Sequence, residues 1–272
     1  MKKKCLAIGI ILLFVGASVI PSFARSISEK SPPILSQGGD HALIHIKSND
    51  EFTSENGVTG GNGTASNPYL IENWVLTSNG SGQAILILDT TAYFIIRNCT
   101  IRGFEDGILF LRVANGAIEK TTIETTTAWD ETGIIIENSH AIIITDNIIN
   151  ADITNLGLES VYNISIYGNI FTGWLVIGSG KNFIFSYNMI HDGSLHVWDN
   201  CILISNNIMT FIDIKKVLYS HVTLRHNYWG KPLVFPKVIY GGIYKPGAYY
   251  DWPWLFIDWT PAQEPYDIPK FV

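Results

Sequence analysis

Apolar and polar residues between 94 and 229 repeat one phrase, which reads apolar-x-apolar-x-x-Asn-x-apolar. We call the repeated polar position the rung. It is occupied by Asn147, Asn169, Asn188, Asn207 and Asn227, and by Cys99 and Thr121 in the first two copies. The steps between rungs are 22, 26, 22, 19, 19 and 20 residues, and all seven copies carry an apolar residue three positions before the rung and two after it. A period near 20 residues, built from short strands alone, predicts a solenoid.

The repeat is too short to bury its own apolar face, so each copy must stack on its neighbours. Equivalent positions then lie about 4.8 Å apart, the spacing of adjacent strands, and stacked Asn amides can hydrogen-bond to one another. Glycines such as Gly107 and Gly133 precede a second apolar run and suit the corner of a coil. The pattern predicts an all-β fold, a right-handed parallel β-helix of about eight coils with N- and C-terminal caps. A β-sandwich is the alternative, but it does not require one residue type at a fixed place in every repeat.

The first 24 residues have the organisation of a secretory signal peptide, with three lysines, an apolar run over 5–20 and a small-x-small cleavage site ending at Ala24. A retained membrane anchor is the alternative. We therefore expect a secreted or cell-surface protein with no further membrane-spanning segment. The expected organisation is a signal peptide over 1–24, a flexible lead-in over 25–40, the β-helix with its N-terminal cap over 41–230, and an aromatic- and proline-rich C-terminal cap over 231–272.

Charge and cysteine content narrow the picture further. Removal of the signal peptide leaves 15 basic and 24 acidic residues, a formal charge of −9, which argues against a nucleic acid partner. Cys99 and Cys201 lie five coils apart, about 24 Å at the strand spacing, whereas a disulfide requires Cα atoms within about 7 Å. We expect two free, buried thiols.

The last forty residues carry Trp252, Trp254 and Trp259, and prolines that include Pro246, Pro253, Pro261, Pro265 and Pro269. Prolines disfavour regular coils, so this segment is expected to close the end of the solenoid. The simplest interpretation is that its aromatic rings plug the core. The alternative is a platform on which sugar rings stack.

The glycine-rich opening segment over 57–74, GVTGGNGTASNPYLIENW, resembles that of exported archaeal right-handed β-helix proteins in the NosD-like and carbohydrate-binding and sugar-hydrolysis group. The segments Asn227–Gly230 (NYWG) and Asp258–Ile268 (DWTPAQEPYDI) are similar to that group as well, so the resemblance spans roughly 41–268. It implies the fold and an exported location. It does not fix the function, because the group contains polysaccharide enzymes, adhesins and a copper-enzyme maturation protein.

Acidic residues in three consecutive turns are the best candidates for a ligand site. Glycoside hydrolases need two or three carboxylates that converge on one glycosidic oxygen, one as acid and one as base, and lyases need a base, usually with calcium. The clusters of the pectinase-type hydrolases are not found in this sequence. The candidate ligand-binding residues are Glu105, Asp106, Trp129, Asp130, Glu131 and Asp152. An insertion carries Trp129 beside two of these acids, which suggests a site for sugar or calcium. The simpler interpretation is a charged turn exposed to solvent. We expect no cofactor, with calcium as the alternative.

The seven histidines, four of them in the C-terminal copies, do not align into a stacked pair or a His-x-His motif. Copper sites favour clusters of Met, Cys and His. We therefore expect no metal site.

The position four before each rung should face outward, yet it is a large aliphatic residue in four copies: Ile95, Ile143, Ile184 and Leu203. An apolar strip on a solenoid face predicts either a covering segment of the chain or a protein partner.

These features together favour an exported protein that recognises carbohydrate or another surface polymer without catalysis, because a long rigid face suits an extended ligand. A polysaccharide lyase or hydrolase with an unrecognised site is the alternative, and copper handling is a weaker one.

Overall fold

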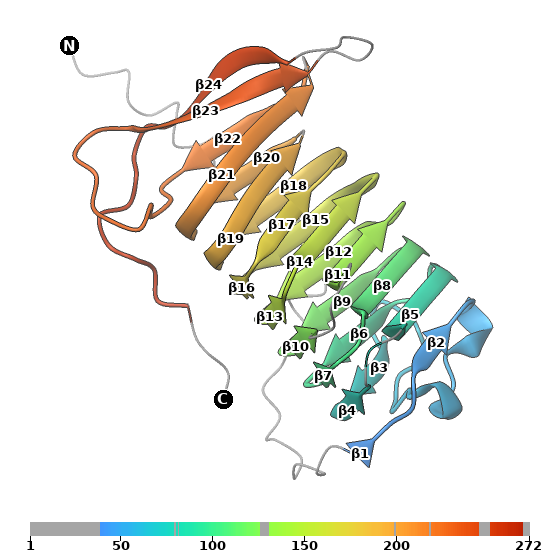
Figure 1. The fold of residues 1–272 in the computed structure, drawn as a ribbon. Coiled ribbons are helices and arrows are strands. Elements are labelled where there is room, and N and C mark those ends of the chain that lie inside the picture. Colours follow the sequence, from blue (N-terminus) through green and yellow to red (C-terminus); the bar gives the residue numbers. More distant parts are fainter. Residues whose placement is uncertain are drawn as a thin grey trace, which may run out of the picture.

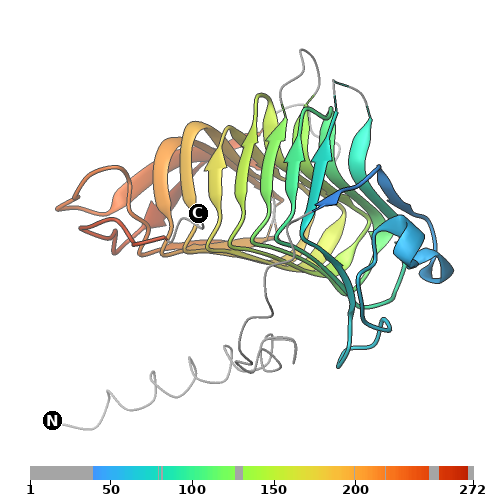
Figure 2. The ribbon, with the colours of Figure 1, turned by 90° about the horizontal axis from the view of Figure 1, so that it is seen from below.

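The computed structural model describes residues 39–78, 80, 82–125, 131–198, 200–217, 219–244 and 251–268. The chain winds into an all-β parallel solenoid, with its coils stacked side by side along one axis (Figures 1 and 2). The predicted fold class is confirmed, with about seven turns rather than eight. The smaller sheet has eight strands, and the chain makes seven full turns between the first of them and the last. The predicted signal peptide and most of the lead-in lie outside the described residues.

The smaller sheet holds one strand from each coil, all parallel. In spatial order it contains β3 (Tyr69–Glu72), β6 (Phe94–Arg97), β9 (Gly116–Glu119), β12 (His140–Thr145), β15 (Val161–Tyr167), β18 (Gly180–Ser186), β20 (Cys201–Ile204) and β22 (Val222–Arg225). It is the sheet in which the strands preceding the rungs pair.

The larger sheet has two arms. The first contains β1 (Gly39–Asp40), β4 (Trp74–Thr77), β7 (Thr100–Arg102), β10 (Thr122–Thr125), β13 (Ile148–Ala151) and β16 (Ile170–Thr172). The second contains β2 (Ile44–Ile46), β5 (Gln83–Thr90), β8 (Asp106–Val113), β11 (Thr132–Glu137), β14 (Thr154–Glu159) and β17 (Trp174–Ile177). The long strand β19 (Met189–Trp198) pairs with both arms, and β21 (Asn207–Val217) follows it. The sheet ends with β23 (Lys237–Tyr244), parallel to β21, and the antiparallel β24 (Trp252–Asp258).

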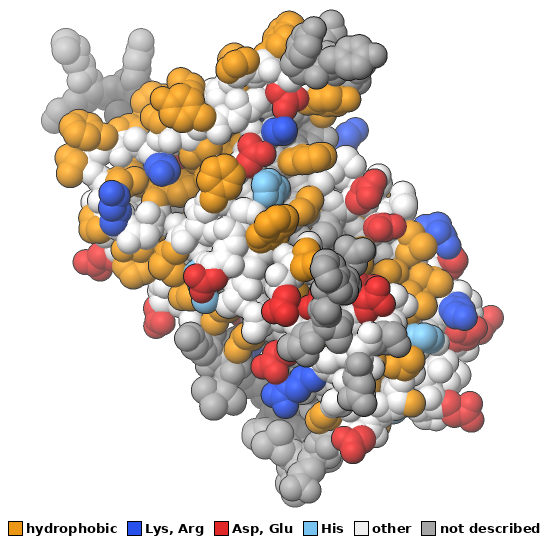
Figure 3. Space-filling model, viewed as in Figure 1, with side chains coloured by type: hydrophobic (Ala, Val, Ile, Leu, Met, Phe, Trp, Pro, Cys, Tyr) orange, Lys and Arg blue, Asp and Glu red, His pale blue; other side chains and the backbone are white. Residues whose placement is uncertain are grey.

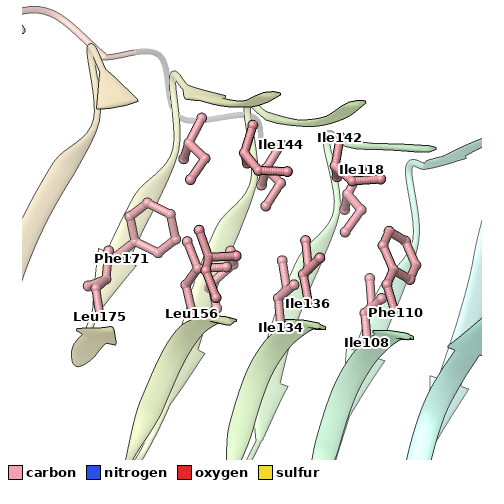
Figure 4. Packing of buried hydrophobic residues seen from close by; sticks show 14 of the residues in the cluster. Ile108, Phe110, Ile118, Ile134, Ile136, Ile142, Ile144, Leu156, Phe171 and Leu175 are labelled. Carbon is pink, nitrogen blue, oxygen red and sulfur yellow. The ribbon is translucent and has the colours of Figure 1, made fainter. Parts of the chain in front are cut away.

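The core is a set of apolar columns that run through the coils. Residues two after the rung form one column, in which Ile101, Ile123, Ile149, Phe171 and Ile190 are paired in register and fully buried. Side chains from facing strands point toward one another in the interior (Figure 4). Each fully buried side chain of this size contributes about 1.5–3 kcal/mol through removal from water, so the columns supply most of the stabilisation.

The rung residues form a continuous hydrogen-bonded column, the Asn ladder, made of Asn147, Asn169, Asn188, Asn206 and Asn227. From Asn169 onward, each Oδ1 accepts both the backbone N–H and the Nδ2–H of the rung residue in the preceding coil, as Asn188 does from Asn169 at 3.0 Å in both cases. The Asn147 Oδ1 accepts the backbone N–H of Thr121. Each Nδ2 also donates to a backbone carbonyl, as Asn188 does to Ile166 at 2.9 Å. The ladder therefore satisfies buried polar groups that would otherwise be costly.

The sequence places the sixth rung at Asn207, and this is wrong by one residue. Asn206 is the ladder residue, and Leu203, three before it, is buried in the core in register with Phe185. The error arises because two asparagines are adjacent. Asn207 instead holds the C-terminal segment: its Nδ2 donates to the Tyr266 carbonyl and its Oδ1 accepts the Tyr266 N–H, both at 2.8 Å.

The N-terminal end of the core is covered by the segment before β3. Two short 3-10 turns, η2 (Asn49–Glu51) and η3 (Ser54–Asn56), flank Phe52, whose buried ring stacks on Tyr69 with centroids 4.6 Å apart. The Trp74 Nε1–H donates to the Gly57 carbonyl at 2.7 Å and ties the glycine-rich loop to the first coil. The glycine-rich segment is therefore held against the first coil, next to the open end of the core.

The C-terminal end is closed by β23 and β24, but not by the tryptophans. Trp252, Trp254 and Trp259 are all exposed, so the expectation that they plug the core is wrong. Phe256 is the buried ring there. Side chains alternate along β24, so Trp252 and Trp254 lie on the same face as Phe256, but the strand is exposed up to Leu255 and burial begins only at Phe256.

A buried carboxylate terminates the Asn ladder. Asp258 is fully buried, and its Oδ2 accepts the backbone N–H of Asn227 at 2.9 Å and the Nε1–H of Trp229 at 3.2 Å. Its Oδ1 accepts the backbone N–H groups of His226 and Thr260. The carboxylate thus occupies the position that the next rung would take.

Cys99 and Cys201 are free and buried, as the sequence predicts. Burial raises the pKa of the Cys99 thiol to about 11, and burial likewise raises the pKa of Cys201. Among the described residues no helix is long and apolar enough to span a membrane.

Replacement of one ladder residue should be strongly destabilising. Asn188→Ala removes the acceptor of two Asn169 donors and the donor to Ile166, and we expect the free energy of unfolding to fall by about 3–5 kcal/mol. Urea denaturation measures this. The matched control is Asn150→Ala, an exposed side chain bonded to Thr172, which should change stability by less than about 1 kcal/mol. Equal effects of the two variants would contradict the ladder's role.

The two buried thiols should be inert in the folded protein. Because the thiolate is the reactive form and both pKa values are raised, a thiol reagent at pH 8 should leave Cys99 and Cys201 unmodified and should label both after denaturation. Peptide mapping by mass spectrometry separates these residues from Cys5. Rapid labelling of either residue in native protein would contradict their burial.

Candidate functional site

The acidic residues lie at the corners where the chain passes from one arm of the large sheet to the other, between β7 and β8, β10 and β11, and β13 and β14. We call this side of the solenoid the acidic edge. Backbone hydrogen bonds from Thr132 to the Glu105 carbonyl and from Thr154 to the Glu131 carbonyl, both 3.0 Å, place these acids in successive coils. Asp152 is exposed in the third of these turns. Trp129 and Asp130 lie outside the described residues.

The acids of this edge differ in surroundings. Glu105 Oε2 accepts the Gly82 N–H at 3.3 Å, and Asp106 Oδ2 accepts Nε2–H of Gln83 at 3.0 Å. Burial raises the pKa of Asp106, while the bond from Gln83 opposes this and the nearby Glu105 charge adds to it. These two carboxylates are thus already bonded to the preceding coil.

Glu131 is fully buried, and neither of its carboxylate oxygens has a hydrogen-bond partner in the part of the chain that the structure describes. The Thr125 hydroxyl and the Asn155 Nδ2, from the same corner of adjacent coils, are also buried without a partner there. An inward carboxylate cannot reach a polymer on the surface. Within the described ranges no group of three or more His, Cys, Asp or Glu side chains is suited to holding a metal ion.

The predicted apolar strip exists, but with Ile202 in place of Leu203. Ile95, Ile143 and Ile184 lie on one outward row of the smaller sheet, but the row continues to Ile202 because Leu203 is buried. The rung is Asn206 rather than Asn207, so the outward position four residues before it is Ile202 rather than Leu203. Whether a partner binds the strip stays a prediction.

A second surface, which the sequence does not predict, is richer in exposed rings. We call the outward side of β17, β19, β21 and β23 the aromatic face; its rings are Trp174, Trp198, Phe211 and Tyr240. Their exposed fractions are 53% for Trp174, 49% for Trp198, 66% for Phe211 and 81% for Tyr240. Figure 3 shows hydrophobic side chains gathered over this end of the large sheet, with acidic, basic and histidine side chains among them. Large exposed apolar patches mark interaction sites.

Strand pairing sets the spacing of the rings. Phe211 pairs with Ser194 on β19, and Trp174 precedes Leu175, the partner of Leu195. Trp174 and Phe211 therefore flank β19 on its two sides, two strand spacings or about 10 Å apart. Trp198 pairs with Lys215 further along the same strands.

Two hollows border the aromatic face. A groove of about 780 Å³ is lined by β21, by β23 and by the segment that follows β22, and its walls include Phe211, Trp229 and Tyr240. A smaller hollow of about 460 Å³ is lined by Trp198, Lys215 and Tyr244. Because Phe211 and Lys215 are on one strand, the two hollows lie at opposite ends of the same strip of surface.

Polar groups lie between the two hollows. The His196 ring is 6.3 Å from the Trp174 ring, centroid to centroid, and its Nδ1 is 3.6 Å from the Asp213 Oδ2. Lys215 Nζ pairs with Asp251 Oδ2 at 2.9 Å. Rings that offer apolar faces beside charged and hydrogen-bonding groups are the usual composition of a ligand site.

The buried Glu131 gives a test of the acidic edge. Because an unpaired buried carboxylate costs free energy, Glu131→Met should raise the free energy of unfolding by about 1–3 kcal/mol, measured by urea denaturation. The control Asp152→Asn, in an exposed turn, should change it by less than about 0.5 kcal/mol. A loss of stability in Glu131→Met, together with stabilisation of the wild type by calcium, would instead make Glu131 a ligand.

Comparison with known protein families, curated proteins and solved structures finds no match to this chain. The parallel β-helix and the geometry of its surfaces are therefore the basis on which its function is argued.

Proposed function

We propose that this protein recognises an extended carbohydrate polymer on its aromatic face, as an exported protein of the cell surface or surroundings. The observation that carries the proposal is the arrangement of three exposed rings, Trp174 on β17, Phe211 on β21 and Tyr240 on β23, on one face beside a groove. Sugar rings present apolar C–H faces that stack on aromatic rings, and their hydroxyls bond to neighbouring polar groups.

The repeat of the fold supports a polymer rather than a single sugar. Strands succeed one another at about 4.8 Å, close to the length of one pyranose residue, so rings two strands apart match alternate sugars of a chain. His196, Asp213 and Lys215 lie between and beside these rings and offer hydrogen bonds to hydroxyl groups. The long axis of the solenoid provides a rigid surface that loses little entropy on binding.

The acidic turns support this function less well than the aromatic face. Glu131 is buried, and Glu105 and Asp106 are bonded to the preceding coil. A lyase or hydrolase mechanism built on these acids would need them to reach a substrate. Export rests on the sequence of residues 1–24, which the structure does not describe.

Removal of stacking rings should weaken polysaccharide binding. In affinity electrophoresis through xylan, mixed-linkage β-glucan or pectin, with and without calcium, the wild type should be retarded by at least one polymer. The double variant Trp174→Ala/Phe211→Ala should bind that polymer about tenfold or more weakly, equivalent to about 1.4 kcal/mol or more.

The matched control is Tyr167→Ala, which removes an exposed ring from β15 on the smaller sheet. It should leave retardation unchanged. Equal loss in the control and the double variant, or no retardation by any polymer, would contradict binding at the aromatic face.

A further inference from the structure

Three side chains at the centre of the aromatic face have the connectivity of a nucleophile, a base and an orienting acid. The Ser194 Oγ is 2.8 Å from the His196 Nε2, and the His196 Nδ1 is 3.6 Å from the Asp213 Oδ2. Ser194 and His196 are two residues apart on β19, and Asp213 is the partner of His196 on β21. The residues come from adjacent strands of a rigid sheet, which suits a preorganised site.

The two ring nitrogens of His196 face different partners. With the proton on Nδ1, Nε2 accepts the Ser194 hydroxyl and Nδ1–H is directed at the Asp213 carboxylate. The longer distance to Asp213 fits an unliganded site, because such contacts shorten when substrate is bound. The same order of contacts activates serine in unrelated folds, and it is recognised by geometry rather than by sequence position.

The surroundings of Ser194 indicate a substrate carried on a polymer. Trp174 and Phe211 flank Ser194, which keeps 8% of its surface exposed. Phe211 lines the groove on one side, and Trp198, two residues after His196, lines the hollow on the other. A polymer that stacks on both Trp174 and Phe211 crosses β19 at Ser194, so a small substituent on that polymer can point toward the serine.

We propose that Ser194, His196 and Asp213 form a hydrolytic site for acyl esters carried by the bound polymer, such as O-acetyl groups on a polysaccharide. The substrate class rests on the proposed carbohydrate binding, whereas the reactivity of Ser194 does not. Ser194 and His196 are the catalytic residues, and Asp213 is a positioning residue.

The reaction consumes one water for each ester. Ser194 Oγ bonds to the carbonyl carbon while its proton passes to His196 Nε2; the ester C–O bond then breaks, and the sugar oxygen takes that proton. Water next bonds to the acyl carbon and gives a proton to Nε2, the bond between the acyl group and Oγ breaks, and Oγ recovers the proton as the carboxylic acid leaves. Because the site is an open face from which water is not excluded, turnover is expected to be slow.

Covalent labelling tests the nucleophile without any assumption about the polymer. The full chain is treated with a fluorophosphonate probe, and peptide mass spectrometry locates the adduct. We expect one adduct, on Ser194, that is lost in His196→Gln and kept in Ser165→Ala, a control serine on the outward row of the smaller sheet. Absence of an adduct on Ser194 in folded protein would overturn the proposal.

Kinetics with p-nitrophenyl acetate and acetate release from acetylated xylan test the reaction. Ser194→Ala should lower the rate at least about tenfold, and Asp213→Asn should lower kcat by about tenfold or more while KM changes little. Unchanged rates in Ser194→Ala would overturn the proposal. If Ser194→Ala does not fold, judged by circular dichroism, Ser194→Cys replaces it, and its new thiol should react with iodoacetamide far faster in the presence of His196 than in the double variant with His196→Gln.

Retention by acetylated xylan separates this proposal from carbohydrate binding. Retention without labelling or hydrolysis would leave the binding function and remove the ester chemistry. Labelling of Ser194 and hydrolysis of p-nitrophenyl acetate without retention would support the nucleophile and overturn the polymer as its substrate.

Discussion

The Asn ladder is the interaction on which the rest of this structure depends. Each rung links the backbone and side chain of one coil to the side chain of the next, so all coils share one register. That register stacks the apolar columns inside and aligns the outward rows on both sheets. A shift of one residue would turn core side chains toward water, and the ladder opposes it because a displaced amide would leave several buried donors unpaired.

The fold could be predicted from the sequence because the ladder needs one residue type at one place in each repeat. The exact rung could not be predicted where Asn206 and Asn207 adjoin. In the structure the residue before each rung adopts positive φ, and here that residue is Ser205, with φ of 56°. A left-handed serine gives no clear signal in sequence, since asparagine and glycine are the residues that favour this conformation. The last residue of the apolar strip was predicted one position too late for the same reason.

The aromatic face was harder to predict because its strands are out of step with the repeat. Trp174 and Phe211 each follow their rung by five residues, but Ser194, which lies between them, follows Asn188 by six. The pairing of β19 with β21 is irregular between His191 and Ser194, and this irregularity absorbs the extra residue. Alignment on the rungs therefore separates side chains that the sheet brings together. For the acidic turns, the position could be predicted from the sequence but the burial could not. Their order along the chain placed them in consecutive coils, but it could not show that Glu131 is buried.

Every amide in the Asn ladder points the same way, so the column is polar along its length. Its C-terminal end presents N–H donors, and the anionic Asp258 meets them as an anion meets the N-terminus of a helix. A neutral Asn there would bring donors of its own, and at this fully buried position no further rung would accept them. A carboxylate accepts hydrogen bonds but donates none. Termination by a carboxylate therefore ends the column of donors inside the molecule, so the last coil needs no further asparagine beyond it.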